Sequence, residues 1–145
     1  MLAQGQLFEI NIMEQLFCPF RRKYVAAKPE EIIRQAFLRQ LVEQFSYPQS
    51  LIGVEVPIAV GAGVDKRCDA VVYAKNLQPL MLLEFKAEHV ALTTEVLDQA
   101  AVYNTTVHAP YLILANGKQT VVAHIDTDKQ ITFLDHIPSW NQLSL

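Results

Sequence analysis

Residues 67–86, RCDAVVYAKNLQPLMLLEFK, decide the fold of this chain. Residues 67–74 and 79–86 are rich in branched and aromatic side chains, and the four residues between them predict a β-hairpin. The second segment is apolar on both faces, with Leu80 and Leu82 on one and Met81, Leu83 and Phe85 on the other. Such a strand is typical of the middle of a sheet that is covered on both sides.

Acidic side chains interrupt both strands of this hairpin. If a two-residue loop joins the strands, Lys75 pairs with Gln78, and the register places Asp69 directly opposite Glu84. Lys86 lies two residues beyond Glu84 and shares its face. Two facing carboxylates repel each other, and a divalent cation between them removes the repulsion. The pattern therefore predicts either a metal-assisted hydrolytic site or a structural cluster of ion pairs.

An amphipathic helix is expected before the hairpin, over residues 29–45. Pro29 suits a first helical turn, Glu30 and Glu31 suit the positive end of the helix dipole, and apolar residues then recur every four positions at Ile33, Phe37, Leu41 and Phe45. On a helical wheel, Glu30 falls inside the arc of these apolar residues, and Glu31 falls nearer its edge. Glu30 is therefore expected to face the core, and Glu31 stays open as the alternative.

The remaining elements extend this pattern in both directions. A strand is expected at 51–59, a helix at 94–107, a strand at 111–115 and a closing hairpin at 121–125 and 131–134. The order α-β-β-β-α-β with a small C-terminal β addition predicts a mixed α/β sandwich with helices on both faces of the sheet. Residues 5–27 form an apolar and basic lead-in, in which alternation at Phe8, Ile10 and Ile12 suggests a short strand. The basic run Arg21-Arg22-Lys23 is expected to be solvated, or else to contact phosphates.

Composition limits the function. The chain has 145 residues, 51% of them hydrophobic, and a formal net charge of −3, which suits one domain and argues against coating nucleic acid by bulk electrostatics. No secretory signal and no apolar run of transmembrane length is seen, so we expect a cytoplasmic protein without membrane contact. Cys18 and Cys68 are expected to be reduced thiols, and the four scattered histidines do not have the spacing of a zinc site.

Five stretches in order resemble one known family: PEEIIRQAFLRQL, LIGVEVPI, KRCDAVVYAKNLQPLMLLEFKA, DQAAVYN and APYLILANG. They resemble the N-terminal nuclease domain of type I restriction enzyme R subunits, which belongs to the PD-(D/E)XK nuclease superfamily. The resemblance spans about residues 28–125, which we take as the core of a single domain over 1–145. It implies a restriction-endonuclease-like αβββαβ sandwich and a Mg²⁺-dependent nuclease acting on DNA, in which Mn²⁺ would substitute.

The resemblance also implies site residues. Asp69 matches the metal-binding aspartate, and Glu84-Phe85-Lys86 matches the (D/E)XK element, with Lys86 as the catalytic lysine and the Phe85 carbonyl as a further metal ligand. Glu30 matches the carboxylate of the first helix, with Glu31 still open. Gln99 and Tyr103 match a QxxxY element, and they share one helix face that could turn toward the substrate.

Partners and alternatives follow from the same comparison. DNA is the implied substrate. The resemblance is also compatible with a helicase or specificity subunit that acts in trans, and with a homodimer. Gly61-Ala62-Gly63 lacks the Gly-Lys-Ser/Thr of a Walker A loop, so no motor is expected in this chain. Two alternatives stay open: a nuclease-like module that binds nucleic acid or a restriction or defence partner without cutting, and a structural subunit of such an assembly.

Overall fold

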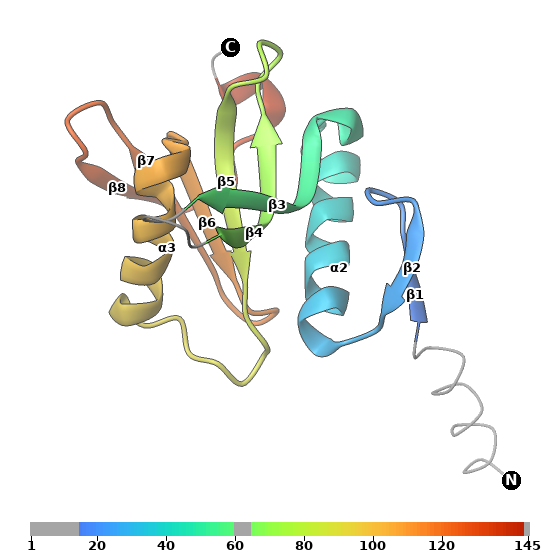
Figure 1. Cartoon of the computed structure of the whole chain (residues 1–145). Helices are drawn as coiled ribbons and strands as arrows, with labels where there is room; N and C mark the ends of the chain where they lie inside the picture. Colours follow the sequence, from blue (N-terminus) through green and yellow to red (C-terminus); the bar gives the residue numbers. More distant parts are fainter. Residues whose placement is uncertain (1–14, 60–64, 144–145) are drawn as a thin grey trace, which may run out of the picture.

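A six-stranded mixed sheet forms the centre of the protein. The computed structural model describes residues 15–59 and 65–143 (Figure 1). The strands lie in the order β3-β4-β5-β6-β7-β8, and only the pair β5–β6 is parallel. Their bounds are Ile52–Ala59, Asp65–Tyr73, Pro79–Phe85, Tyr111–Ala115, Thr120–Ile125 and Ile131–Leu134. The strand order, with helices before β3 and before β6, confirms the predicted α/β sandwich and its small C-terminal β addition.

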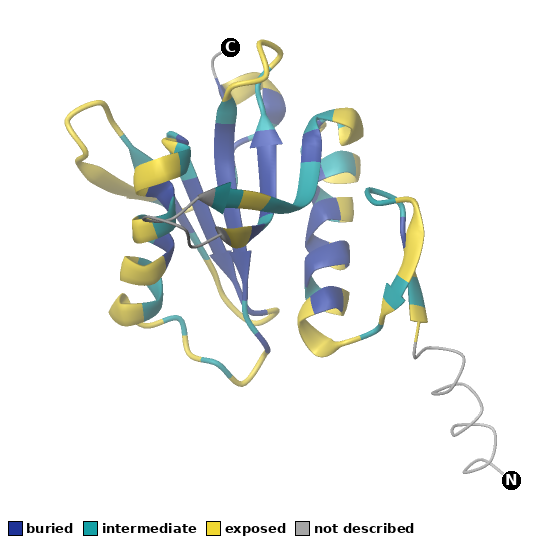
Figure 2. Ribbon diagram, in the orientation of Figure 1, coloured by how far each residue is buried: buried dark blue, intermediate teal, exposed yellow. Residues whose placement is uncertain are grey.

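One helix covers each face of this sheet. Helix α2 (Pro29–Gln44) packs Leu38 and Leu41 against Met81, Leu83 and their neighbours on one face. Helix α3 (Thr94–Val107) packs Ala100 against Leu82 and its neighbours on the other. Strand β5 runs between the two cores and is buried along almost its whole length (Figure 2). The prediction of a central strand that is apolar on both faces is confirmed.

The loop of the β4–β5 hairpin differs from the prediction. Tyr73 pairs with Pro79, and the Ala74 N–H donates to the Gln78 carbonyl at 2.8 Å, so three residues rather than two form the turn. Leu77 takes a positive φ of 66° there. A register shift between Val72 and Tyr73 compensates for the extra loop residue. Ala70 consequently pairs with Leu83, and Asp69 and Glu84 come next in register, as expected.

A second, two-stranded sheet lies outside the main one. Strands β1 (Gln15–Cys18) and β2 (Lys23–Ala26) pair antiparallel beside α2 (Figure 1). This hairpin was not predicted. The strand suggested at Phe8, Ile10 and Ile12 lies outside the described residues.

The C-terminal segment closes one end of the core. Two short 3₁₀ helices, η1 (Gln49–Leu51) and η2 (Trp140–Leu143), complete the described elements. The Tyr47 hydroxyl donates to the Pro138 carbonyl at 2.8 Å, and its ring lies 5.7 Å from that of Trp140. Both rings therefore act in packing. Among the described residues, no helix is long and apolar enough to span a membrane.

Candidate active site

A bend in the β3–β4 ribbon creates the candidate site. Val54 and Ala70 belong to the core under α2, whereas Val56 and Cys68 belong to the core under α3. Residues two apart normally share a face, so the ribbon changes face at the level of Glu55 and Asp69. Glu55 has a φ of +53°, a conformation that bends the strand out of regular geometry.

The backbone pairing of β4 with β5 stops just before Asp69. The β4–β5 ladder runs only from Tyr73 to Ala70, although β4 itself extends back to Asp65. Asp69 instead accepts a hydrogen bond from the Phe85 N–H at 2.7 Å, through Oδ2. Its own N–H donates to Glu84 Oε1 at 3.5 Å. The split between two strands thus brings together the carboxylates that the sequence placed opposite each other.

Glu84 is the buried member of this pair, and only 7% of its surface is exposed. Burial first, and then the charge of Asp69, raises the pKa of Glu84 from 4.5 to about 8, while Lys86 acts in the opposite direction. The backbone of Lys86 is fixed by its N–H, which donates to the Ala115 carbonyl at 2.9 Å. Glu84 therefore binds its proton more tightly than a free glutamate does, and a cation bound beside it would favour the ionised form.

A network of ion pairs occupies the other side of Asp69. Glu31 is bound by Arg34, by Arg21 at 2.5 Å and by the Gln35 amide at 3.0 Å. Burial alone would raise the pKa of Glu31, but the hydrogen bonds from Arg34 and Arg21 outweigh it and lower that pKa. The ionised carboxylate is stabilised by these arginines and is not available as a free ligand.

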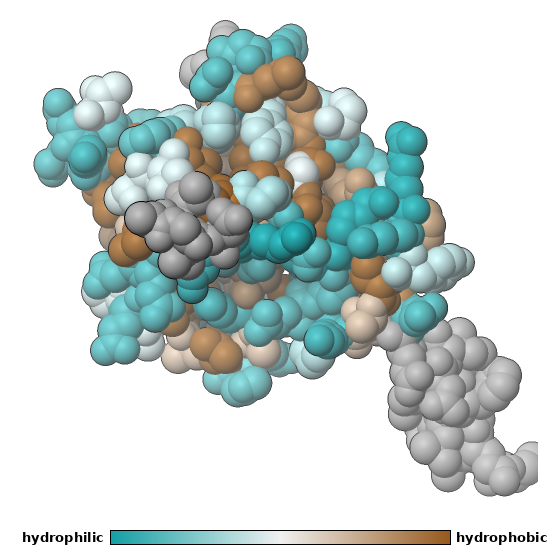
Figure 3. Space-filling view, in the orientation of Figure 1, coloured by the Kyte–Doolittle hydropathy of each residue, from teal (hydrophilic) through white to brown (hydrophobic). Residues whose placement is uncertain are grey.

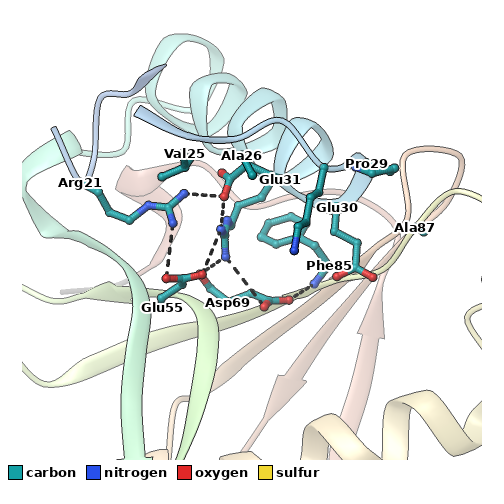
Figure 4. Close-up of a pocket in the computed structure, with 12 residues that line it drawn as sticks. Arg21, Val25, Ala26, Pro29, Glu30, Glu31, Glu55, Asp69, Phe85 and Ala87 are labelled. Atoms are coloured by element: carbon teal, nitrogen blue, oxygen red, sulfur yellow. Dashed lines mark hydrogen bonds and ion pairs between the residues drawn. The ribbon is translucent and has the colours of Figure 1, made fainter. Parts of the chain in front are cut away.

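The same arginines connect α2 to the bend. Arg34 Nη1 donates to the Asp69 carbonyl at 3.4 Å and lies 3.9 Å from Oδ1 of the same residue. Arg21 and Arg34 lie 3.4 Å and 3.6 Å from the carboxylate oxygens of Glu55 (Figure 4). The expectation that Arg21 is merely solvated is wrong, because its guanidinium is largely buried between two carboxylates.

The wheel-based prediction for the helix carboxylate is also wrong. Glu31 is the buried residue, and Glu30 is exposed. The buried side of α2 is centred on Glu31, Arg34 and Leu38, since ion pairing allows charged residues to face inward. Glu30 nevertheless lines the cavity described next.

A cavity of about 490 Å³ opens between α2, β2 and the bend. Glu30, Asp69 and Phe85 lie on its wall, and Figure 4 shows the Glu30 carboxylate on the same side as Phe85. Neither Glu84 nor Lys86 lines it; Glu84 alternates with Phe85 along β5 and shares the face of Leu82, which packs under α3. The predicted residues of α3 lie apart from this cavity: Gln99 is exposed, and Tyr103 packs on the core under α3.

The donor set fits a hard divalent cation. Within residues 15–59 and 65–143, no three His, Cys, Asp or Glu side chains converge as a metal site. The Asp69 and Glu84 pair nevertheless fits Mg²⁺, which commonly uses one or two carboxylates and keeps several waters. Burial is the main cause of the raised pKa of Glu84 and the charge of Asp69 adds to it, and a cation bound between the two carboxylates would offset both.

The fold defines the class of protein: a nuclease-like α/β domain of the restriction-endonuclease type. Residues 29–138 match the family described as type I restriction enzyme R protein N terminus, and the chain belongs to that family. The resemblance read from the sequence is confirmed. No curated protein sequence matches the chain.

Solved structures share this fold. A fragment assigned to the HsdR subunit of a type I restriction enzyme from Vibrio vulnificus YJ016 is 17% identical, with a TM-score of 0.52, over 73% of this chain and 22% of its own. A protein assigned as a nuclease of the DUF820 group from Anabaena variabilis ATCC 29413 is 11% identical, with a TM-score of 0.51, over 90% of this chain and 83% of its own. A chain of a DrdV–DNA complex is 19% identical, with a TM-score of 0.49, over 72% of this chain and 10% of its own. This chain thus spans about a tenth of the length of the DrdV-complex chain and about a fifth of the length of the HsdR fragment.

Sequence reasoning missed the ion-pair network. Arg34 and Glu55 were not singled out as site residues. Glu55 could have been noticed as a lone charge within the apolar run LIGVEVPIA, and the three-residue spacing of Glu31 and Arg34 is that of a helical ion pair.

Proposed function

We propose that this domain is a Mg²⁺-dependent nuclease that hydrolyses phosphodiester bonds in DNA. One observation carries the proposal: Asp69 and Glu84 meet where β4 separates from β5, with Lys86 directly after the end of β5. The rigid strands would hold both carboxylates in place before the substrate binds. The family membership of residues 29–138 supports the same reaction class.

Each residue has a distinct part in the proposed reaction. Asp69 and Glu84, with the Phe85 carbonyl, would hold the metal ion. A bound Mg²⁺ would polarise the phosphoryl oxygens and make a bound water more acidic. The Phe85 N–H orients Asp69 by donating to Oδ2, and Lys86 would position the attacking water or stabilise the charge that develops on the phosphate. Glu30 would complete the acidic wall of the cavity, whereas Gln99 and Tyr103 lie outside it on α3 and could contact only DNA that extends over that helix.

The alternative is a nuclease-like module that binds DNA or a restriction partner without cutting it. The position of Arg34 favours this alternative, because its guanidinium lies 3.9 Å from Asp69 and already supplies positive charge to that carboxylate. A module of this kind would have no requirement for Lys86. A helicase or specificity subunit acting in trans is compatible with both proposals, since the chain matches only a part of longer restriction subunits.

Cleavage of supercoiled plasmid and of single-stranded DNA distinguishes the two. The nuclease proposal expects cutting with Mg²⁺ or Mn²⁺ that stops when a chelator is added. Titration calorimetry with Mn²⁺ provides the second readout. A protein that neither cuts DNA nor binds Mn²⁺ would contradict the nuclease proposal and leave the binding module.

A further inference from the structure

The β1–β2 hairpin carries an unusual concentration of positive charge. Residues 15–28 contain Arg21, Arg22, Lys23 and Lys28 and no acidic residue, in a chain whose net charge is −3. Arg22, Lys23 and Lys28 are exposed. Figure 3 shows hydrophilic side chains gathered at this edge of the molecule, over the hairpin and α2. The segment lies outside residues 29–138, which match the family.

Two aromatic rings stand on the same hairpin. Phe17 and Tyr24 are cross-strand partners whose ring centroids lie 5.3 Å apart, in an edge-to-face arrangement. They are 47% and 67% exposed, respectively. A cross-strand aromatic pair stabilises a hairpin, but that role does not require such exposure. Exposed rings beside cations are the combination with which proteins bind unpaired nucleic-acid strands, through base stacking and phosphate contacts.

The hairpin is also fixed relative to the candidate active site. Arg21, in its turn, pairs with Glu31 at 2.5 Å and with Glu55 at 3.4 Å. Val25 and Ala26 of β2 line the same cavity as Asp69. The hairpin therefore borders this cavity.

We infer that the β1–β2 hairpin binds an unpaired DNA strand, with Tyr24 and Phe17 stacking on bases and Arg22 and Lys23 contacting phosphates. The inference rests on the proposed function, whose substrate it describes. Arg21 has a different role, since its ion pairs hold the hairpin against the bend. Phe17 and Tyr24 share one face of the hairpin because they are cross-strand partners, and the exposed Arg22 and Lys23 lie beside them at its turn.

Direct binding tests this inference without any cleavage. Anisotropy of a fluorescein-labelled oligothymidylate is measured with the whole chain, with Ca²⁺ in place of Mg²⁺. Tyr24→Val keeps a strand-forming residue but removes the ring, and we expect it to weaken binding about fivefold to a hundredfold, the loss associated with one base stack. Tyr24→Phe should restore most of the affinity. The matched control is Phe133→Val, which removes a ring that is 59% exposed on β8.

The cations have their own readout. Arg22→Ala with Lys23→Ala should lower the slope of log affinity against log salt by about 0.7 for each lost contact with a single strand. Lys75→Ala with Lys129→Ala removes two exposed cations from other turns and should leave the slope unchanged.

The outcomes also separate this inference from the nuclease proposal. Hairpin variants that bind like their controls would overturn the inference, as would a wild-type chain without affinity for the oligonucleotide, and the hairpin would then be assigned to protein contacts. If such a wild type still cuts plasmid, the nuclease proposal stands alone. Hairpin-dependent binding by a protein that neither cuts DNA nor binds Mn²⁺ would support the inference and contradict the nuclease.

Discussion

Replacing Glu84 by glutamine should stabilise the protein and abolish its activity. Burial and the charge of Asp69 raise the pKa of Glu84 from 4.5 to about 8, so the folded protein binds this proton more tightly than the unfolded chain does. A raised pKa contributes stability that is fully present below the unfolded value of about 4.5 and is lost as the pH rises through the folded value. The free energy of unfolding of the metal-free wild type should therefore fall between pH 4.5 and 8.

The size of this effect follows from the pKa difference. Each unit is worth about 1.4 kcal/mol, so the difference between 4.5 and 8 sets an upper limit of about 5 kcal/mol. Solvent relaxation around the pair should reduce this limit to a gain of about 1–3 kcal/mol for Glu84→Gln at pH 8.5. The gain should be close to zero at pH 5, where the glutamate is protonated in the folded protein. Buried carboxylates kept ionisable at such a cost are typical of functional sites.

Urea denaturation of the metal-free protein at several pH values provides the assay. The matched control is Glu88→Gln, because Glu88 is exposed and forms a surface ion pair with Lys118 at 3.7 Å. It should change stability by less than about 0.5 kcal/mol at every pH. A Glu84→Gln variant with the same pH dependence as the wild type would refute the account of the pair. Mn²⁺ should stabilise the wild type and leave Glu84→Gln almost unaffected.

Further variants test the packing around the site. Arg34→Ala leaves the buried Glu31 with one arginine fewer and should lower the free energy of unfolding by about 3–5 kcal/mol in chemical denaturation, whereas a loss below 1 kcal/mol would mean that water replaces the guanidinium. Leu83→Ala empties a fully buried position in the core under α2 and should cost about 2–5 kcal/mol, and a thermal midpoint equal to that of the wild type would contradict the packing described. Tyr47→Phe removes the hydrogen bond to Pro138 and should cost about 1 kcal/mol by the same denaturation assay, and a stabilised variant would argue against that bond.

Much of the fold could be predicted from the sequence because local signals agreed with tertiary structure. Helix α3 begins and ends at the expected residues, since the Thr93 side chain caps its N-terminus by accepting from the Val96 N–H and Pro110 follows its end. Strand β6 also has its expected bounds. Pro110 and Asn116 delimit a short apolar run, and such a run is typical of a strand buried on both faces of a sheet.

Other features depend on contacts that no local pattern records. Glu31 can face inward because it pairs with Arg21, which belongs to the separate β1–β2 hairpin. A helical wheel shows only the residues of its own helix and so cannot reveal this partner. The three-residue β4–β5 turn uses a left-handed Leu77 where glycine or asparagine would have been the signal. The register still came out as expected, because the shift at Val72 and Tyr73 offsets the longer loop.

Plasmid cleavage by wild type and by Lys86→Ala tests the central claim most directly. Lys118→Ala serves as the control, because it removes an exposed lysine from another turn. We expect Mg²⁺-dependent cutting by the wild type and the control, and a loss of cutting in Lys86→Ala while oligonucleotide and Mn²⁺ binding persist. Equal cutting by all three proteins would contradict the assignment of catalysis to Asp69, Glu84 and Lys86.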